Sequence, residues 1–178
     1  MPLHVYEDCR SLASITIPDS VTSIGDESFY GCNALQYKVK NNIKYLGNAN
    51  HPYVVVIGVT DKTLTSYTIE NSVKVICNSA FENCSSLTSV VIPDSVTCIG
   101  YKAFFGCESL TSINIPNSVT SIDKYAFWGC TSLTNVAFKN TSGWTAGDTS
   151  LSSSDLANSS TAAKYLNSTY EDCSWKRS

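Results

Sequence analysis

The 178-residue chain is poor in charged side chains, histidine and methionine. Charged residues make up 15% of it, and it has two histidines, one methionine and a formal net charge of −3. A nucleic-acid-binding domain normally carries a basic excess, so this charge balance argues against nucleic-acid partners. The hydrophobic content of 43% is high enough to bury a core and argues against a disordered chain.

The chain also lacks long apolar runs. No stretch of about 18 apolar residues occurs, so the sequence predicts no transmembrane helix. The first residues have neither a basic start nor an apolar stretch, so we do not expect them to form a signal peptide. Val5–Cys9 aligns with Ser28–Cys32 inside the repeat described below. We therefore expect the chain to begin in mid-repeat, as a fragment of a longer protein or a truncated copy.

Motifs for catalysis and metal binding are missing as well. The sequence contains no Gly-x-Ser-x-Gly, no His-Glu-x-x-His, no phosphate-binding glycine loop and no Cys-x-x-Cys. Neither His4 nor His51 has a metal-ligand partner at helical spacing. We predict no catalytic residues, no metal site and no cofactor, and we do not expect an enzyme.

What the chain does contain is a repeat of 23 residues. Ile69, Ile92, Ile115 and Phe138 follow one another at this spacing, and so do Cys84, Cys107 and Cys130. Self-similarity at a fixed period of this length is the signature of a solenoid. The shared pattern is Cys-x-x-Leu-x-x-Ile/Val-x-Ile-Pro-x-x-Val-x-x-Ile-x-x-x-Ala-Phe.

The copy that begins at Cys107 shows the local structure to expect. Ile113 and Ile115 alternate with polar neighbours, which indicates a strand, and Pro116 ends that strand. Residues 119–122 form a second short extended piece, and residues 123–127 form one helical or 3₁₀ turn. A single unit cannot bury enough surface to offset the entropy of ordering it. Stacking of units, with strands paired in parallel, supplies the missing burial.

This pattern resembles the BspA-like (Treponema pallidum-type) leucine-rich repeats over roughly residues 5–40 and 61–140. The resemblance implies a curved right-handed leucine-rich repeat solenoid of about six 23-residue repeats, with parallel strands on the concave face. It also implies a cell-surface or secreted protein that adheres to protein or glycan partners on host or neighbouring cells.

Two segments depart from the repeat. We expect residues 1–140 to form the solenoid, with a β-hairpin inserted at about 41–60, and residues 141–178 to form either a cap or a disordered tail. The hairpin either packs on the solenoid or protrudes as a flap that exposes Tyr45, His51 and Tyr53 to a partner.

Five of the eight cysteines share one repeat position: Cys9, Cys32, Cys84, Cys107 and Cys130. A repeated interior position is a packing requirement, and parallel Cβ vectors do not suit disulfides. We therefore predict a ladder of buried, unbridged thiols.

The outward face of the first strand in each repeat is the candidate binding surface. Its side chains are small and uncharged, and they suit hydrogen bonding to glycan or peptide. The candidate residues here are Ser66, Thr68, Ser89, Val91, Ser112, Asn114 and Asn135. The sequence favours a non-enzymatic recognition or adhesion module. The alternative is a structural spacer that self-associates through an uncapped N-terminal edge.

Overall fold

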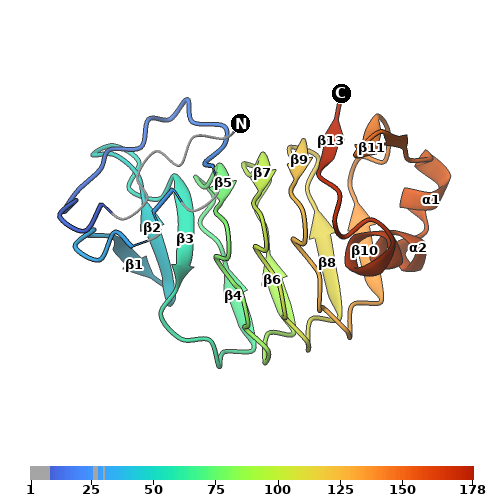
Figure 1. Cartoon of the computed structure of the whole chain (residues 1–178), viewed down its shortest axis with the longest axis horizontal. Coiled ribbons are helices and arrows are strands. Elements are labelled where there is room, and N and C mark those ends of the chain that lie inside the picture. The colour runs from blue at the N-terminus through green and yellow to red at the C-terminus, as the bar shows by residue number, and fades with distance from the viewer. Residues whose placement is uncertain (1–8, 26–27, 30) are drawn as a thin grey trace.

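The computed structural model describes residues 9–25, 28–29 and 31–178 and shows a stack of coils with their strands side by side (Figure 1). Each complete coil has two short strands joined by tight turns, and equivalent residues of neighbouring coils lie 23 positions apart. The prediction of a solenoid with 23-residue repeats and parallel strands is confirmed. The mid-repeat start expected at residues 5–8 lies outside the described residues.

The first strand of the coil recurs four times along the stack. Ser66 lies opposite Ser89 in one parallel pair, and Ser112 lies opposite Asn135 in the other. Pro93 and Pro116 follow two of these strands, and a proline cannot extend the hydrogen-bond ladder. The four strands are β4 (Ser66–Thr68), β6 (Ser89–Val91), β8 (Ser112–Ile115) and β10 (Asn135–Phe138).

The second strand of the coil recurs as β5 (Val75–Ile76), β7 (Cys98–Ile99) and β9 (Ser121–Ile122). These three strands are parallel and form the centre of a nine-stranded sheet in the order β1-β2-β3-β5-β7-β9-β13-β11-β12. Strands that are not part of the regular repeat therefore extend this sheet at both ends: β1, β2 and β3 at one end, and β13, β11 and β12 at the other.

The third side of each coil is made of tight turns and contains no helix in the described part of the chain. The N–H of Ala126 donates to the carbonyl of Asp123 at 3.2 Å, and the N–H of Trp128 donates to that of Tyr125 at 3.1 Å. Tyr125 lies between these bonds in the left-handed region, with φ 57°, so the turn does not propagate as the single helical or 3₁₀ turn that the sequence predicts. Bonds between coils hold this side together instead, such as Phe104 N–H to Ala126 O at 2.8 Å.

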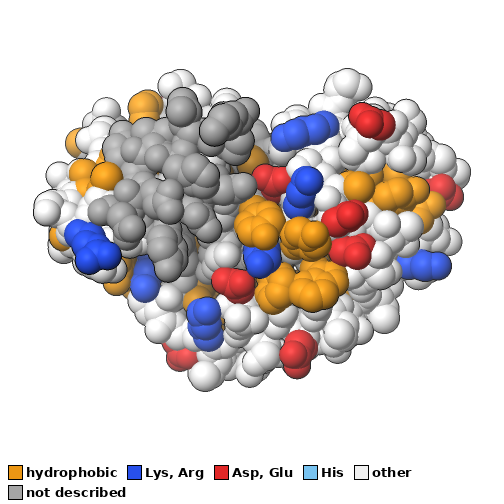
Figure 2. All heavy atoms as spheres, viewed as in Figure 1, with side chains coloured by type: hydrophobic (Ala, Val, Ile, Leu, Met, Phe, Trp, Pro, Cys, Tyr) orange, Lys and Arg blue, Asp and Glu red, His pale blue; other side chains and the backbone are white. Residues whose placement is uncertain are grey.

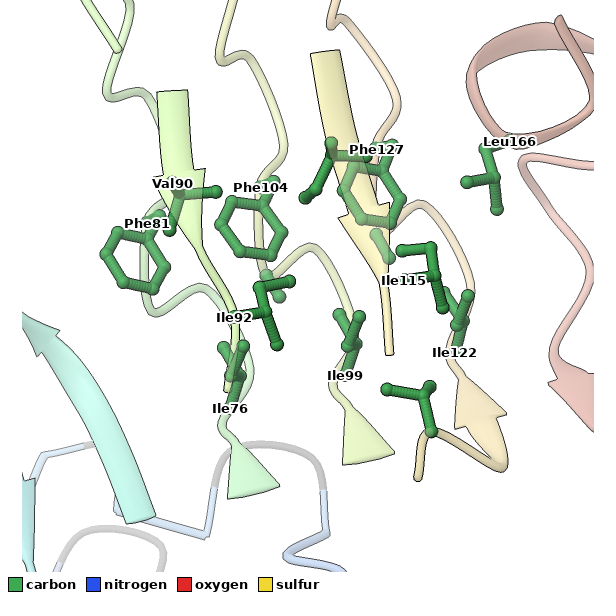
Figure 3. Close-up of a cluster of buried hydrophobic side chains, with 14 of the residues drawn as sticks. Ile76, Phe81, Val90, Ile92, Ile99, Phe104, Ile115, Ile122, Phe127 and Leu166 are labelled. Carbon is green, nitrogen blue, oxygen red and sulfur yellow. The ribbon is translucent and has the colours of Figure 1, made fainter. Parts of the chain in front are cut away.

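The core is a set of ladders inside the coils (Figure 3). The rings of Phe81, Phe104 and Phe127 stack at 5.0 and 5.2 Å, with interplanar angles of 5° and 8°. The thiol of Cys107 donates to the carbonyl of Phe81, and that of Cys130 to the carbonyl of Phe104, each at 3.2 Å. None of the eight cysteines forms a disulfide. Cys32, Cys84, Cys107 and Cys130 are buried as predicted, whereas Cys9 is half-buried.

Residues 38–59 contribute three antiparallel strands. They are β1 (Lys38–Lys40), β2 (Ile43–Leu46) and β3 (Val55–Val59). β2 pairs with β1 on one side and with β3 on the other, and β3 then pairs in parallel with β5. The β2–β3 hairpin therefore occupies the position that a preceding coil would take, at the N-terminal side of the stack.

The two N-terminal repeat copies do not continue the stack, and the expectation that about six repeats stack in one row is wrong here. Ile17, Cys32 and Leu35 pack against Val55 and Val75 in a second hydrophobic cluster. Alternate residues of those strands, such as Val56 and Ile76, belong to the solenoid core. Side chains alternate across a strand, so the described residues of the N-terminal copies cover the outer face of the sheet at β3, β5 and β7.

Two features of the sequence explain this placement. The hairpin already pairs with β5, which leaves no free strand for an earlier coil. The second copy also has Lys38 and Lys40 where the repeat needs buried aliphatic residues, and both lysines are exposed in β1. The described residues of the N-terminal copies keep a contact of the repeat type, because Gln36 N–H donates to Ala13 O at 2.9 Å.

The segment after β10 folds back over the last coil. Its strands are β11 (Trp144–Ala146), β12 (Thr149–Ser150) and β13 (Trp175–Arg177), and β13 pairs antiparallel with β9. Two short helices, α1 (Ser153–Ala157) and α2 (Ser159–Lys164), and the π-helical turn η1 (Tyr165–Thr169) lie between them. α2 packs against β10. Buried in the common core are Trp144, Leu151, Leu156, Leu166 and Trp175.

Candidate binding surfaces

The outward side chains of β4, β6, β8 and β10 form one exposed face, which we call the strand face. All seven residues expected there are exposed. Their neighbours Tyr67, Val90, Ile113 and Val136 are buried, because the strands alternate between core and solvent.

Threonines extend the strand face by one row. Thr88 N–H donates to Thr65 O at 2.8 Å, and Thr134 N–H donates to Thr111 O at 3.1 Å, so the residues at this position lie side by side in pairs. All four are exposed. Val91, with 59% of its surface accessible, is the one large apolar side chain on the strand face. The face therefore offers hydroxyl and amide groups at the spacing of neighbouring coils and carries no charge.

The three residues predicted to lie on the flap differ in exposure. Tyr45 is fully buried, so the hypothesis that it is exposed to a partner is wrong: it alternates with Lys44 on β2 and points into the core. Burial raises the pKa of Tyr45 to about 12. Tyr53 is half-buried, and its ring lies 5.1 Å from that of Tyr45.

His51 is exposed but already has a partner. Its Nδ1 lies 2.7 Å from Asp19 Oδ2, and Asn48 Nδ2 donates to the other oxygen of that carboxylate at 2.7 Å. The bond from Asn48, followed by that from His51, lowers the pKa of Asp19. These contacts hold the β2–β3 connection against the N-terminal copies, so the exposed His51 side chain already contributes to the structure.

A hollow of about 250 Å³ lies where the N-terminal copies meet the β2–β3 hairpin. Its walls come from the N-terminal copies and the hairpin, and they include Ile15, Gln36, Tyr37, Leu46 and Pro52. Among the described residues that line it, Lys38 is the one charged side chain. In the described part of the chain, no group of three His, Cys, Asp or Glu side chains could hold a metal ion.

A second exposed surface was missed by the sequence reasoning. Tyr101, Phe105, Tyr125 and Trp128 gather on the turn side of two neighbouring coils around Lys102, and we call this group the aromatic patch. Figure 2 shows hydrophobic side chains gathered around a basic one on this face. The available signal was the aromatic residues next to the Ala-Phe step in these two copies, at positions where the repeat pattern allows any residue.

Both the repeat sequence and the fold have counterparts among known proteins. Residues 2–51 and 60–174 match the BspA type leucine rich repeat region, in six copies. The chain belongs to this family. It is also similar to the leucine-rich repeat protein TpLRR of T. pallidum, with 25% identity, a TM-score of 0.52, and 60% of this chain and 51% of that chain covered.

A second solved structure, a leucine-rich repeat protein from Eubacterium ventriosum, is 31% identical with a TM-score of 0.52, over 71% of this chain and 36% of that one. A leucine rich cell surface protein from Faecalibacterium prausnitzii is 24% identical with a TM-score of 0.43, over 73% of this chain and 48% of that one. This BspA-type chain thus spans about half of these proteins or less. No curated protein matches it.

Among residues 9–25, 28–29 and 31–178, no helix has the length and apolar character needed to cross a bilayer.

Proposed function

We propose that this chain is a non-enzymatic recognition module of a surface or secreted protein, and that it binds a protein or glycan partner through the strand face. The observation that carries the proposal is the row of exposed, small, uncharged side chains across four successive strands. None of these side chains packs in the core. Their identity can therefore be set by binding without loss of stability.

The chemistry of the strand face suits a polar, uncharged partner surface. Hydroxyl groups both donate and accept hydrogen bonds, and amides do the same with fixed geometry. Because the strands are fixed by core packing, ordering these side chains costs little on binding. Surface location is part of the proposal and rests on the family.

The test is a screen of the folded chain against immobilised glycans, host matrix proteins and bacterial surface preparations. We expect saturable binding to at least one of them. Changing Ser112 and Asn114 together to Lys should weaken that binding at least ten-fold, because two ammonium groups would have to be desolvated in the contact.

A matched control carries the same added charge elsewhere. Thr149 in β12 and Ala157 in α1 are exposed on the C-terminal segment and are not part of the strand face. The T149K/A157K variant should bind like the parent chain. No saturable binding in the whole screen would refute the proposal, and equal losses in both variants would show that charge and not position matters.

A further inference from the structure

The aromatic patch combines four rings from two coils. The ring centroids of Phe105 and Trp128 lie 5.0 Å apart, those of Tyr101 and Tyr125 lie 5.9 Å apart, and those of Tyr125 and Trp128 lie 6.2 Å apart. Trp128 keeps 45% of its surface exposed. Tyr101, Phe105 and Tyr125 are half-buried beside it. Single exposed apolar residues are ordinary, whereas apolar side chains gathered in one place are a feature of interaction sites.

These rings are not a continuation of the core ladder. Inside the coil the Phe104 and Phe127 rings are nearly parallel, at 8°, and fully buried. In the patch, Phe105 and Trp128 are tilted by 51°, and Tyr101 and Tyr125 by 81°. The outer rings therefore do not provide the regular stacking on which the core depends.

The backbone beneath the patch is already paired between coils. Lys102 N–H donates to Lys124 O at 3.2 Å, and Gly106 N–H donates to Trp128 O at 2.9 Å. Binding modes that add a peptide strand need free main-chain groups, and this backbone does not offer them. The same bonds hold the patch rigid, which favours a ligand recognised by ring stacking and by a few polar groups.

A cation lies among the rings. Lys102 Nζ is 5.1 Å from the Tyr101 ring centroid and 4.9 Å from the Phe105 ring centroid. No carboxylate of the described residues forms an ion pair with it. An ammonium that lies over aromatic faces and pairs with no carboxylate of the described residues is complementary to an anionic group on a ligand.

The edge of the patch carries the opposite charge. Glu82 occupies the position of Phe105 in the preceding coil, and its neighbour Asn83 donates its N–H to Phe105 O at 2.7 Å. On the other side, the Tyr125 N–H donates to the carbonyl of Glu171. With a formal net charge of −3 on the chain, these carboxylates oppose the approach of a polyanion.

We propose that the aromatic patch binds a sugar that carries a single carboxylate. The C–H groups of the pyranose ring lie on the electron-rich faces of Trp128 and Tyr125, and the carboxylate of the sugar pairs with Lys102. Glu82 at the edge accepts hydrogen bonds from sugar hydroxyls. This surface is distinct from the strand face, so the inference stands apart from the proposed function.

The experiment is a titration of the whole chain with sialyllactose and, in parallel, with lactose, a heparin fragment and an acidic peptide. We expect sialyllactose to bind at least ten-fold more tightly than each of the other three. Trp128→Ala should abolish this binding, and Lys102→Met should reduce sialyllactose to the level of lactose.

The chain supplies matched controls. Tyr37 is 44% exposed and has Lys44 Nζ 4.9 Å from its ring centroid, outside the patch. Tyr37→Ala and Lys44→Met should leave sialyllactose binding unchanged. These controls separate the aromatic patch from another exposed ring that has a cation beside it.

A readout without substitutions covers the case of a variant that fails to fold. Trp144 and Trp175 are each 1% exposed, so quenching of fluorescence by acrylamide reports mainly on Trp128. Sialyllactose should protect this signal and lactose should not. Absence of protection, undiminished binding by Trp128→Ala, or tighter binding of lactose, heparin or the acidic peptide would each overturn the inference.

Discussion

At the scale of single residues, the stacked phenylalanines Phe81, Phe104 and Phe127 are the main contributors to stability that we expect. Phe104 has a stacked ring on either side, at 5.0 and 5.2 Å, and none of its surface is exposed. Removing it would leave a void that rigid neighbouring coils cannot fill, because they are held to one another by hydrogen bonds.

We therefore predict that Phe104→Ala lowers the free energy of unfolding by about 3–5 kcal/mol. Trp128→Ala, which removes a larger ring from the surface, should cost less than about 1 kcal/mol. Urea unfolding followed by circular dichroism measures both. A similar loss in the two variants would contradict the assignment of the inner ladder as the stabilising one.

The buried thiols give the protein a dependence on alkaline pH. Burial, followed by the nearby Cys107, raises the pKa of Cys84 from 9.0 to about 12. Below pH 9 the thiol is neutral in both the folded and the unfolded chain, so its contribution to stability is complete. As the pH rises from 9 towards 12, the unfolded chain ionises first and this contribution is lost.

We predict that the thermal midpoint falls as the pH rises through this window, and that Cys84→Ala makes the fall shallower. Differential scanning calorimetry between pH 8 and 11 tests this. An identical slope in the variant would show that Cys84 does not take part in the titration.

At the scale of elements, the left-handed turns fix where each coil reverses. Gly106 has φ 67°, and a Cβ there would lie 2.6 Å from Asn83 Oδ1. Asn83 itself fills the equivalent position in the preceding coil, with φ 58°. Asparagine tolerates this conformation better than most residues, so the two positions provide a matched pair.

Gly106→Ala should destabilise the chain by about 1–2 kcal/mol or more, because left-handed backbone and a close contact add together. Asn83→Gly should be near neutral in comparison. Melting temperatures of the two variants decide the matter, and an unaffected Gly106→Ala variant would mean that the turn can relax.

The sequence predicted the regular coils because a fixed period constrains every copy at once. Ile113 and Ile115 mark strand and core together, and the buried ladders follow from repetition. The N-terminal copies were placed wrongly because the local pattern does not say which strand pairs with β5. That choice depends on the hairpin, which competes for the same edge.

The candidate surfaces were predictable to different degrees. The exposure of Ser112 and Asn114 follows from strand alternation alone. The burial of Tyr45 depends on the register of β2 against β3, which has an irregularity between Lys44 and Tyr45. The aromatic patch could not be predicted without knowing that the turns of two neighbouring coils lie in contact. Its residues occupy positions at which the repeat pattern allows any residue.

At the scale of the whole molecule, the ends of the nine-stranded sheet are the places where a strand of a second chain could pair. β1 is the N-terminal edge strand and exposes Lys38, Val39 and Lys40. Charged edge strands oppose pairing with another chain. This chemistry does not favour the spacer hypothesis of end-to-end growth through that edge.

We predict a monomer across micromolar concentrations, whereas replacing Lys38 and Lys40 together by Val should produce concentration-dependent association. Sedimentation velocity distinguishes the two. Association of the parent chain would restore the spacer hypothesis, and a monomeric double variant would show that other features guard the edge.

The most direct test of the recognition role is the dissociation constant of a partner found in the screen for two variants of equal charge. S112K/N114K should bind at least ten-fold more weakly than T149K/A157K, because only the former alters the strand face. Equal dissociation constants for the two variants would contradict binding through the strand face.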